Sequence, residues 1–229
     1  MLAEALGFDF LDTGAMYRSV TYAVLDSGID PSDEEAVFQL ASQLDIQINS
    51  QQVTVNGNDV SELIRSPEVG LSIGKIADNV NVRKRLSYWQ RQWATGRRVV
   101  TEGRDQGSEV FPDAICKIFL VASSEERARR RQSELAARGI LLDWETVLNQ
   151  QNQRDLEDRS RPVGALRKAE DSIEFSTDGL SLEAVVSRLE AIVRKRLTGE
   201  EHGIHGIDEK SNRPGDCGTE QQFGEGSFQ

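Results

Sequence analysis

Short apolar segments alternate with amphipathic helical segments along most of this chain, and this alternation constrains the fold more than any other feature. Apolar runs predict strands at residues 8–11, 98–101, 117–121 and 173–177. Periodic patterns predict helices at residues 2–6, 15–26, 33–44, 80–95, 123–139, 144–156 and 182–197. Strands separated by helices of this length form parallel sheets that helices cover. The sequence therefore predicts an α/β fold.

One segment departs from this alternation. In residues 46–60, β-branched residues alternate with polar ones, and Asn56-Gly57 is a turn signal. This pattern predicts a small antiparallel hairpin inserted between helices. Residues 199–229 are acidic and rich in glycine, with little apolar content, and we expect them to be disordered.

The composition disfavours several classes of protein. The 229 residues carry a net charge of -11, which makes general binding to nucleic-acid backbones unfavourable. No run of about 18 apolar residues could cross a membrane, and the first residues do not read as a signal peptide. We therefore expect a soluble cytoplasmic protein that binds neither nucleic acid nor membrane.

Histidine and cysteine chemistry is also excluded from most of the chain. Both histidines, His202 and His205, lie in the acidic terminal segment, so neither histidine catalysis nor a histidine-ligated metal is expected in residues 1–198. Cys116 and Cys217 are too few for a disulfide framework or a four-cysteine zinc site. No metal-ligating residue is predicted.

Polar motifs follow two of the predicted strands. Residues 12–18 (Asp-Thr-Gly-Ala-Met-Tyr-Arg) turn from a strand into a helix, and residues 102–105 (Glu-Gly-Arg-Asp) follow the strand at 98–101. Ligands of open α/β sheets bind at the carboxyl ends of the strands. Thr13 and Arg18 could there bind an oxyanion, although a capped helix start with a surface arginine explains the first motif equally simply. A turn with a local ion pair is the simpler explanation of the second.

Two further segments are rich in arginine. Residues 126–131 lie on one predicted helix, where Glu125, Glu126 and Glu134 can pair with some of the arginines. In residues 154–161, Arg154 is predicted at a helix end and Arg161 in a mobile loop. A charged surface explains either segment. The sharper hypothesis for the second is a closing loop that brings arginines to a transferring phosphoryl group, whose oxygens carry negative charge in the transition state.

Taken together, these segments resemble bacterial cytidylate kinases, and the likeness covers about residues 1–197. The matching elements are Phe10–Arg18, Glu102–Asp105 with Val110–Ala114, Lys117–Leu120, Arg154-Asp155 with Asp158, Arg161-Pro162, and Ala169–Asp171. Their combination is specific, although no single element is. The resemblance implies transfer of the γ-phosphoryl group of ATP to CMP or dCMP, with Mg²⁺ as cofactor.

The resemblance also implies a domain organisation. It predicts a P-loop-type parallel sheet flanked by helices, with a small inserted α+β domain that binds the monophosphate, and with a lid. Residues 1–30 and 76–198 would form the kinase core, residues 31–75 the inserted domain, and residues 154–166 the lid. We expect a monomer, although no motif in the sequence determines the oligomeric state.

Substrate-binding roles follow from the same likeness. Thr13 is implied to contact the ribose side of the nucleotide, and Arg18 and Arg104 to hold its phosphate. Arg83 and Asp105 are implied to recognise the cytosine base.

Further roles concern the sugar and the transferred phosphate. Asp158 is implied to contact the sugar, and Arg154 and Arg161 to grip the phosphates during transfer, as the catalytic residues. Arg127 and Arg130 are implied to lie toward ATP.

The sequence departs from the family in three places. Glu102 stands where the family often has aspartate, which preserves the charge. Gly74 stands where many members have a serine that bonds the cytosine, and this leaves Arg83 and Asp105 to distinguish cytosine from uracil. The third departure is the absence of any Gly-x-x-x-x-Gly-Lys-[Ser/Thr] phosphate loop.

The absent loop leads to a structural expectation. The family carries the loop ahead of the helix that ends at residues 2–6, together with a central strand between those predicted at 98–101 and 117–121. We expect this strand and loop to be missing from the chain, as a gene model with a truncated start would produce.

Alternatives to an active cytidylate kinase remain open at this stage. A non-catalytic remnant would keep the acceptor side and lose the ATP side, and another nucleoside monophosphate kinase, such as a UMP kinase, would use the same parts. A phosphatase has no supporting cysteine or aspartate nucleophile motif.

Overall fold

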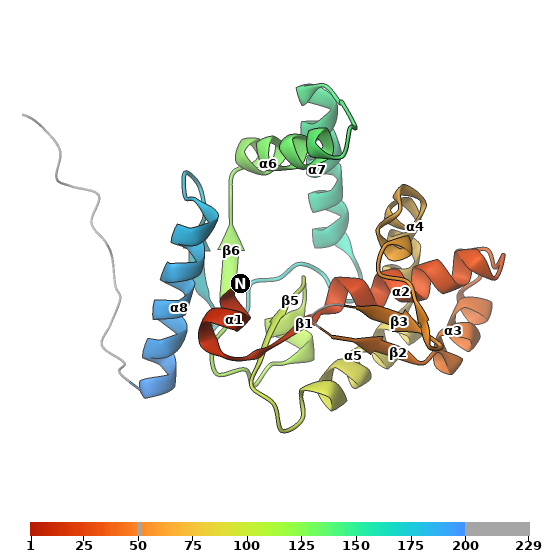
Figure 1. The fold of residues 1–229 in the computed structure, drawn as a ribbon, viewed down its shortest axis with the longest axis horizontal. Helices are drawn as coiled ribbons and strands as arrows, with labels where there is room; N and C mark the ends of the chain where they lie inside the picture. The colour runs from red at the N-terminus through yellow and green to blue at the C-terminus, as the bar shows by residue number, and fades with distance from the viewer. Residues whose placement is uncertain (50–51, 200–229) are drawn as a thin grey trace, which may run out of the picture.

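The computed structural model describes residues 1–49 and 52–199 and confirms the α/β fold. Strand β1 (Asp9–Asp12) pairs in parallel with β5 (Val99–Glu102), and β6 (Ile118–Val121) pairs in parallel with β7 (Ile173–Ser176). Figure 1 shows both pairs inside the ring of helices. The terminal segment predicted to be disordered falls outside the described residues, apart from Gly199.

Side-chain caps explain where most of the helices begin. Serine, aspartate or asparagine residues accept hydrogen bonds from backbone N–H groups of the first turn in α2 through α8. The helices are α1 (Leu2–Leu6), α2 (Thr13–Asp26), α3 (Glu34–Gln43), α4 (Pro67–Asp78), α5 (Val80–Ala94), α6 (Ser124–Ala137), α7 (Trp144–Ser160) and α8 (Leu182–Thr198), with short helical turns η1 (Leu63–Arg65) and η2 (Gln106–Val110).

The predicted hairpin is part of a three-stranded antiparallel sheet. Strand β2 (Ile46–Ile48) pairs with β3 (Val53–Val55), which also pairs with β4 (Asn58–Asp59). The Asn56-Gly57 turn therefore joins β3 to β4. Asn56 and Gly57 both have positive φ, of 51° and 81°, as a tight hairpin turn requires.

Two differences from the predicted helices affect the site. The sequence pattern indicated a helix end near Leu156, but α7 continues to Ser160, so Arg154 lies inside the helix rather than at its end. Helix α4 was not predicted, and it crosses the expected domain boundary between residues 75 and 76. The division into a core, an inserted domain and a lid stays a proposal.

The two parallel strand pairs are not joined to each other by strand pairing within residues 1–49 and 52–199. Phe10 of β1 and Leu120 of β6 are 47% and 53% exposed, which is unusual for large apolar residues of a parallel sheet. The central strand expected between β5 and β6 would join the two pairs into one sheet. Its absence from the fold stays a prediction.

The apolar core lies mainly beneath α2. Leu11, Val20 and Val24 are almost completely buried with residues of α3, α5 and the antiparallel sheet. A second, smaller cluster joins α6 to α7 through Ala128, Leu135 and Val147. In Figure 1 these two helices stand at the top, apart from α2, α3 and α4 at the right. In the ranges described, no helix is long and apolar enough to cross a membrane.

Candidate functional site

The site begins where β1 and β5 end. Asp12 and Glu102 are partners in the parallel register, which places their carboxylates side by side at the carboxyl edge of this strand pair. Asp12 caps α2 by accepting a hydrogen bond from the N–H of Ala15 at 2.8 Å. Thr13 donates its hydroxyl to the carbonyl oxygen of Glu102 at 2.6 Å and is 4% exposed. The first predicted motif and the second therefore meet directly.

A buried ion pair lies behind this edge. Arg83 of α5 and Asp105 are 5% and 6% exposed, and the guanidinium Nη2 donates to the Asp105 carboxylate. Arg83 Nη1 also donates to the carbonyl oxygen of Ala77 at 2.9 Å. The sequence assigned these two residues to one base-recognition site, and the fold brings them together from positions 22 residues apart.

Tyr17 completes the surroundings of that pair. The Arg83 guanidinium carbon lies 5.6 Å from the centre of the Tyr17 ring. Burial raises the pKa of Tyr17 from 10.0 to about 12, against the opposing effect of the nearby Arg83 charge. The phenol is therefore neutral throughout the physiological range, and the surroundings of the ion pair are largely closed to water.

A chain of ion pairs links the second motif to the end of α7. Arg104 Nε lies 2.6 Å from Asp158, and Arg161 Nη1 lies 2.9 Å from the other oxygen of the same carboxylate. Arg161 Nε also lies 2.9 Å from Asp78 at the end of α4. The sequence suggested a mobile loop around Arg161, but its side chain is only 15% exposed and is held by two carboxylates. Arg161 therefore anchors this segment.

Two predicted arginines lack such partners. Neither Arg18 nor Arg154 forms an ion pair with a residue of the described ranges. Desolvation lowers the pKa of both guanidinium groups. For Arg18 the nearby charge of Arg154 lowers the pKa further, and for Arg154 that of Arg104 does so. The charge of Asp12 opposes this shift at Arg18, and that of Asp158 opposes it at Arg154. Guanidinium groups that are not engaged in an ion pair can bind an added anion.

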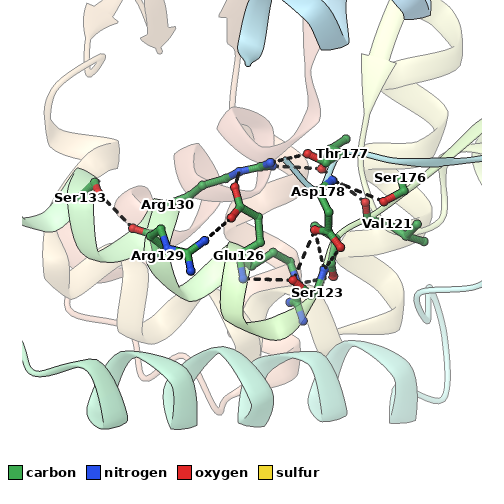
Figure 2. A network of polar contacts seen from close by, with 11 residues as sticks. Val121, Ser123, Glu126, Arg129, Arg130, Ser133, Ser176, Thr177 and Asp178 are labelled. Carbon is green, nitrogen blue, oxygen red and sulfur yellow. Dashed lines mark hydrogen bonds and ion pairs between the residues drawn. The ribbon is translucent and has the colours of Figure 1, made fainter. Parts of the chain in front are cut away.

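The predicted ATP-side residues are paired with protein groups instead. Arg127 Nη1 donates to Asp155 of α7 at 2.7 Å, and Arg130 donates to Glu126 at 3.0 Å. Figure 2 shows Arg130 reaching from α6 to Thr177, whose carbonyl oxygen accepts a hydrogen bond from Nη2 at 2.7 Å. The predicted pairing of this arginine run with Glu126 and Glu134 is confirmed.

The loop after β7 is tied to the start of α6. Asp178 accepts a hydrogen bond from the N–H of Ser123 at 2.9 Å, and Ser123 caps α6 through Glu126, as Figure 2 shows. Between α6 and α7 lies a cavity of about 250 Å³. Arg127, Arg130 and Arg154 line it together with Arg131, Glu134 and Gln151. This cavity brings the predicted ATP-side arginines into one space with the catalytic candidate Arg154.

Several residues of the site were missed in the sequence. Arg65 of η1 lies 4.0 Å from Asp12, and its charge lowers the pKa of Arg18. Asp78 and Glu109 contact the segment after α7. Tyr17 belongs to the first motif, but no functional role was predicted for it. No spacing signal links these residues, because each comes from a different element and only tertiary packing gathers them.

Two carboxylates, those of Asp12 and Glu102, lie at the strand ends. Burial raises the pKa of Glu102, and the neighbouring charge of Asp12 raises it further. No group of three or more histidine, cysteine or acidic residues suited to a metal occurs in the described part of the chain. Two carboxylates with substrate phosphates are nevertheless a common way to hold Mg²⁺.

A parallel α/β fold with polar motifs at its strand ends and unpaired guanidinium groups on the neighbouring helices is typical of phosphate-binding α/β proteins. The model of the family described as cytidylate kinase matches residues 1–195. Since that match covers most of the sequence, the chain belongs to the cytidylate kinase family, a family of nucleoside monophosphate kinases.

Individual relatives agree with the family match. The chain is 50% identical over 194 residues to a cytidylate kinase of Rhodopirellula baltica, covering 85% of each protein. It is 41% identical over 208 residues to a cytidylate kinase of Oceanobacillus iheyensis, covering 89% of this chain and 90% of the relative. It is also 44% identical to a bifunctional pantoate ligase/cytidylate kinase of Synechococcus elongatus, covering 40% of that longer protein.

Proposed function

We propose that this protein is a cytidylate kinase that transfers the γ-phosphoryl group of ATP to CMP or dCMP. The observations that carry the proposal are two arginines without an ion pair in the described ranges, Arg18 and Arg154, and the buried Arg83–Asp105 pair. The first two groups suit a phosphate and the pair suits the polar edge of a base. The names of the relatives support this reaction.

The acceptor nucleotide would lie along the strand ends. Arg18 and Arg104 bind its phosphate, and the Asp158 carboxylate faces the sugar. In the present structure Arg104 and Asp158 bind each other at 2.6 Å. Binding of the nucleotide would therefore exchange this contact for two contacts with the substrate. Thr13, whose hydroxyl now bonds the Glu102 carbonyl, would contact the ribose side.

Base recognition would rest on Arg83 and Asp105. The carboxylate accepts a hydrogen bond from the exocyclic amine of cytosine, and the guanidinium donates to the O2/N3 edge. A buried site of this kind rejects a base that leaves its polar groups unpaired. Uracil carries a carbonyl where cytosine carries the amine, so CMP should be preferred over UMP.

Phosphoryl transfer would depend chiefly on Arg154 and Arg161. Negative charge spreads over the oxygens of the transferred group, and guanidinium groups stabilise it without accepting a proton. Arg154 lines the cavity between α6 and α7, and Arg127 and Arg130 line the same cavity toward the proposed ATP side. Arg161 would be drawn toward the phosphates from its present contacts with Asp78 and Asp158.

The carboxylates of Asp12 and Glu102 would hold Mg²⁺ together with the ATP phosphates. The bound cation would neutralise charge on the β- and γ-phosphates. In the described ranges, no third acidic residue is grouped with these two carboxylates. The substrate phosphates would therefore supply the remaining ligands of the cation.

The organisation of the active protein is part of the proposal. Residues 31–75 would form the domain that closes over the monophosphate, residues 1–30 and 76–198 the core, and residues 154–166 the lid. We propose a cytoplasmic monomer that binds neither nucleic acid nor membrane, in keeping with the net charge of -11. Light scattering after size exclusion tests the monomer, and a dimer mass would contradict it.

An assay of ADP release with CMP, dCMP, UMP and AMP as acceptors tests the function. The protein is measured as residues 1–229 and with a strand and phosphate loop placed ahead of Met1. We expect turnover in the extended protein with CMP and dCMP above the other acceptors. Preference for UMP would favour a UMP kinase. CMP binding without turnover in either form would favour a non-catalytic nucleotide-binding protein.

A further inference from the structure

Gly164 packs so closely on the Arg83 guanidinium that its position leaves no room for a side chain. It is buried, with a φ of 68°, in the loop that follows α7. A Cβ atom at this position would lie 1.5 Å from Nη2 and 1.9 Å from Cζ of Arg83. The space that a side chain would need is therefore already occupied by the guanidinium of the proposed base-recognition pair.

The loop is fixed at several points around this contact. We call residues 161–166 the closing loop. The N–H of Gly164 donates to Glu109 Oε1 at 3.2 Å, and the N–H of Leu166 donates to the carbonyl oxygen of Asp158 at 2.7 Å. Arg161 is held by Asp78 and Asp158, and Ala165 is 1% exposed. The approach of Gly164 to Arg83 therefore belongs to an anchored segment.

Arg83 has little freedom to yield. Its two terminal nitrogens are engaged by Asp105 and by the carbonyl oxygen of Ala77, and its side chain is 7% exposed. A side chain at position 164 must either separate Arg83 from Asp105 or push the closing loop outward. Outward movement would also displace Arg161, which lies in the same loop.

We propose that Gly164 is a positioning residue for base recognition: because it has no side chain, the closing loop packs directly on Arg83 and holds the guanidinium in its pair with Asp105. This inference rests on the proposed function. It adds a residue that touches neither the base nor the phosphate and acts only through Arg83. The proposal also links the position of the proposed lid, residues 154–166, to the choice between cytosine and uracil.

Gly28 provides a matched control. It has the same φ of 68°, but a Cβ atom there would meet nothing within 4 Å. Gly28→Ala therefore carries only the backbone strain of the left-handed conformation, whereas Gly164→Ala carries that strain and the overlap with Arg83. The difference between the two variants isolates the contact.

The first experiment is calorimetric titration of residues 1–229 with CMP and UMP. Gly164→Ala should raise the Kd for CMP about ten- to a hundredfold and bring the ratio of UMP to CMP Kd toward one. Gly28→Ala should change neither. An unchanged ratio in Gly164→Ala would overturn the proposal, because loss of general stability alone does not alter the choice between two pyrimidines.

The second experiment needs no nucleotide. Midpoints of chemical unfolding are measured for Gly164→Ala, Arg83→Ala and the double variant. Gly164→Ala should shift the midpoint more than Gly28→Ala, and the excess should disappear once Arg83 is alanine. An excess that persists, or none at all, overturns the contact. If the unfolding midpoints change as expected but the wild-type chain does not bind CMP, the contact between Gly164 and Arg83 stands. The proposed function is then overturned, together with the role of Gly164 in base recognition.

Discussion

The acceptor side and the donor side of the site differ in how their arginines are used. On the proposed acceptor side, Arg18 has no ion pair with a described residue, while Arg83 is fixed against Asp105. Arg154, which also lacks an ion pair, lines the cavity between α6 and α7. On the donor side, Arg127 is paired with Asp155, and Arg130 with Glu126 and Thr177. Arg18 is thus available to a bound anion on the proposed acceptor side, whereas the arginines of the proposed donor side line a cavity but are already held by protein groups.

This difference separates two kinds of arginine that look alike in a sequence. An arginine that is desolvated near other cations and has no ion-pair partner gains most from a bound phosphate, because the ligand relieves the repulsion. An arginine already paired with protein groups must first give up those contacts. We therefore expect binding of the acceptor nucleotide to require fewer additional protein segments than binding of ATP.

The largest expected effect concerns the donor side. The sequence contains no Gly-x-x-x-x-Gly-Lys-[Ser/Thr], whose backbone N–H groups and lysine would hold the β- and γ-phosphates. We expect residues 1–229 to lack measurable ADP release, and an upstream strand and phosphate loop to restore turnover and raise the Tm. Replacing the lysine of the added loop by alanine is the control. Turnover by residues 1–229 at an ordinary kinase rate would contradict the expectation.

Arg154 gives the next largest effect. In the extended protein, Arg154→Ala should lower kcat about a hundred- to a thousandfold with a smaller change in KM for CMP, because its charge acts chiefly in the transition state. Arg159→Ala removes another exposed arginine of the same helix, one that does not line the cavity between α6 and α7, and should leave kcat unchanged. If Arg154→Ala alters KM alone, Arg154 belongs to ground-state binding instead.

Gly74 offers a gain of function on the acceptor side. A Cβ atom at Gly74 of α4 would meet nothing within 4 Å, so a serine can be accommodated. Gly74→Ser should strengthen CMP binding relative to UMP by about two- to tenfold, if the added hydroxyl bonds the base. Gly74→Ala controls for the change in helix propensity. An equal gain with alanine would remove the hydroxyl from the explanation.

The smallest expected effect is on the titration of Tyr17. Its raised pKa, about 12, means that the folded protein keeps this phenol protonated while an unfolded chain ionises it near 10.0. This contribution to stability is therefore present below pH 10 and is lost as pH rises through 12. A phenolate absorbance titration should resolve one late tyrosine that disappears in Tyr17→Phe. If all three tyrosines titrated near pH 10, the result would contradict the burial of Tyr17 on the acceptor side.

The strand and helix alternation predicted much of the fold. The helix predicted at residues 2–6 is α1, and the four predicted strands form two parallel pairs. Helix α4 escaped prediction, although Pro67 follows the capping residue Ser66 as in many helix starts. The end of α7 was placed too early because the charged segment before Arg161 has no apolar period.

The candidate site was predictable only in part. Arg83 and Asp105 were assigned together through resemblance, and the fold pairs them. The anchoring of Arg161 by Asp78 could not be read from the sequence, since these residues are 83 positions apart and neither lies in a spacing motif. The approach of Gly164 to Arg83 depends on the path of a loop. Such contacts are set by tertiary packing, which local patterns do not encode.

Calorimetric titration of residues 1–229 with CMP, UMP and AMP tests the central claim, that the acceptor side recognises a cytidine monophosphate. Wild type should bind CMP most tightly, and Arg83→Ala should weaken CMP binding about ten- to a hundredfold and abolish the preference. Lys84→Ala, which removes the exposed neighbouring charge, should bind as wild type does. Equal affinity of the wild-type chain for all three nucleotides would contradict the account.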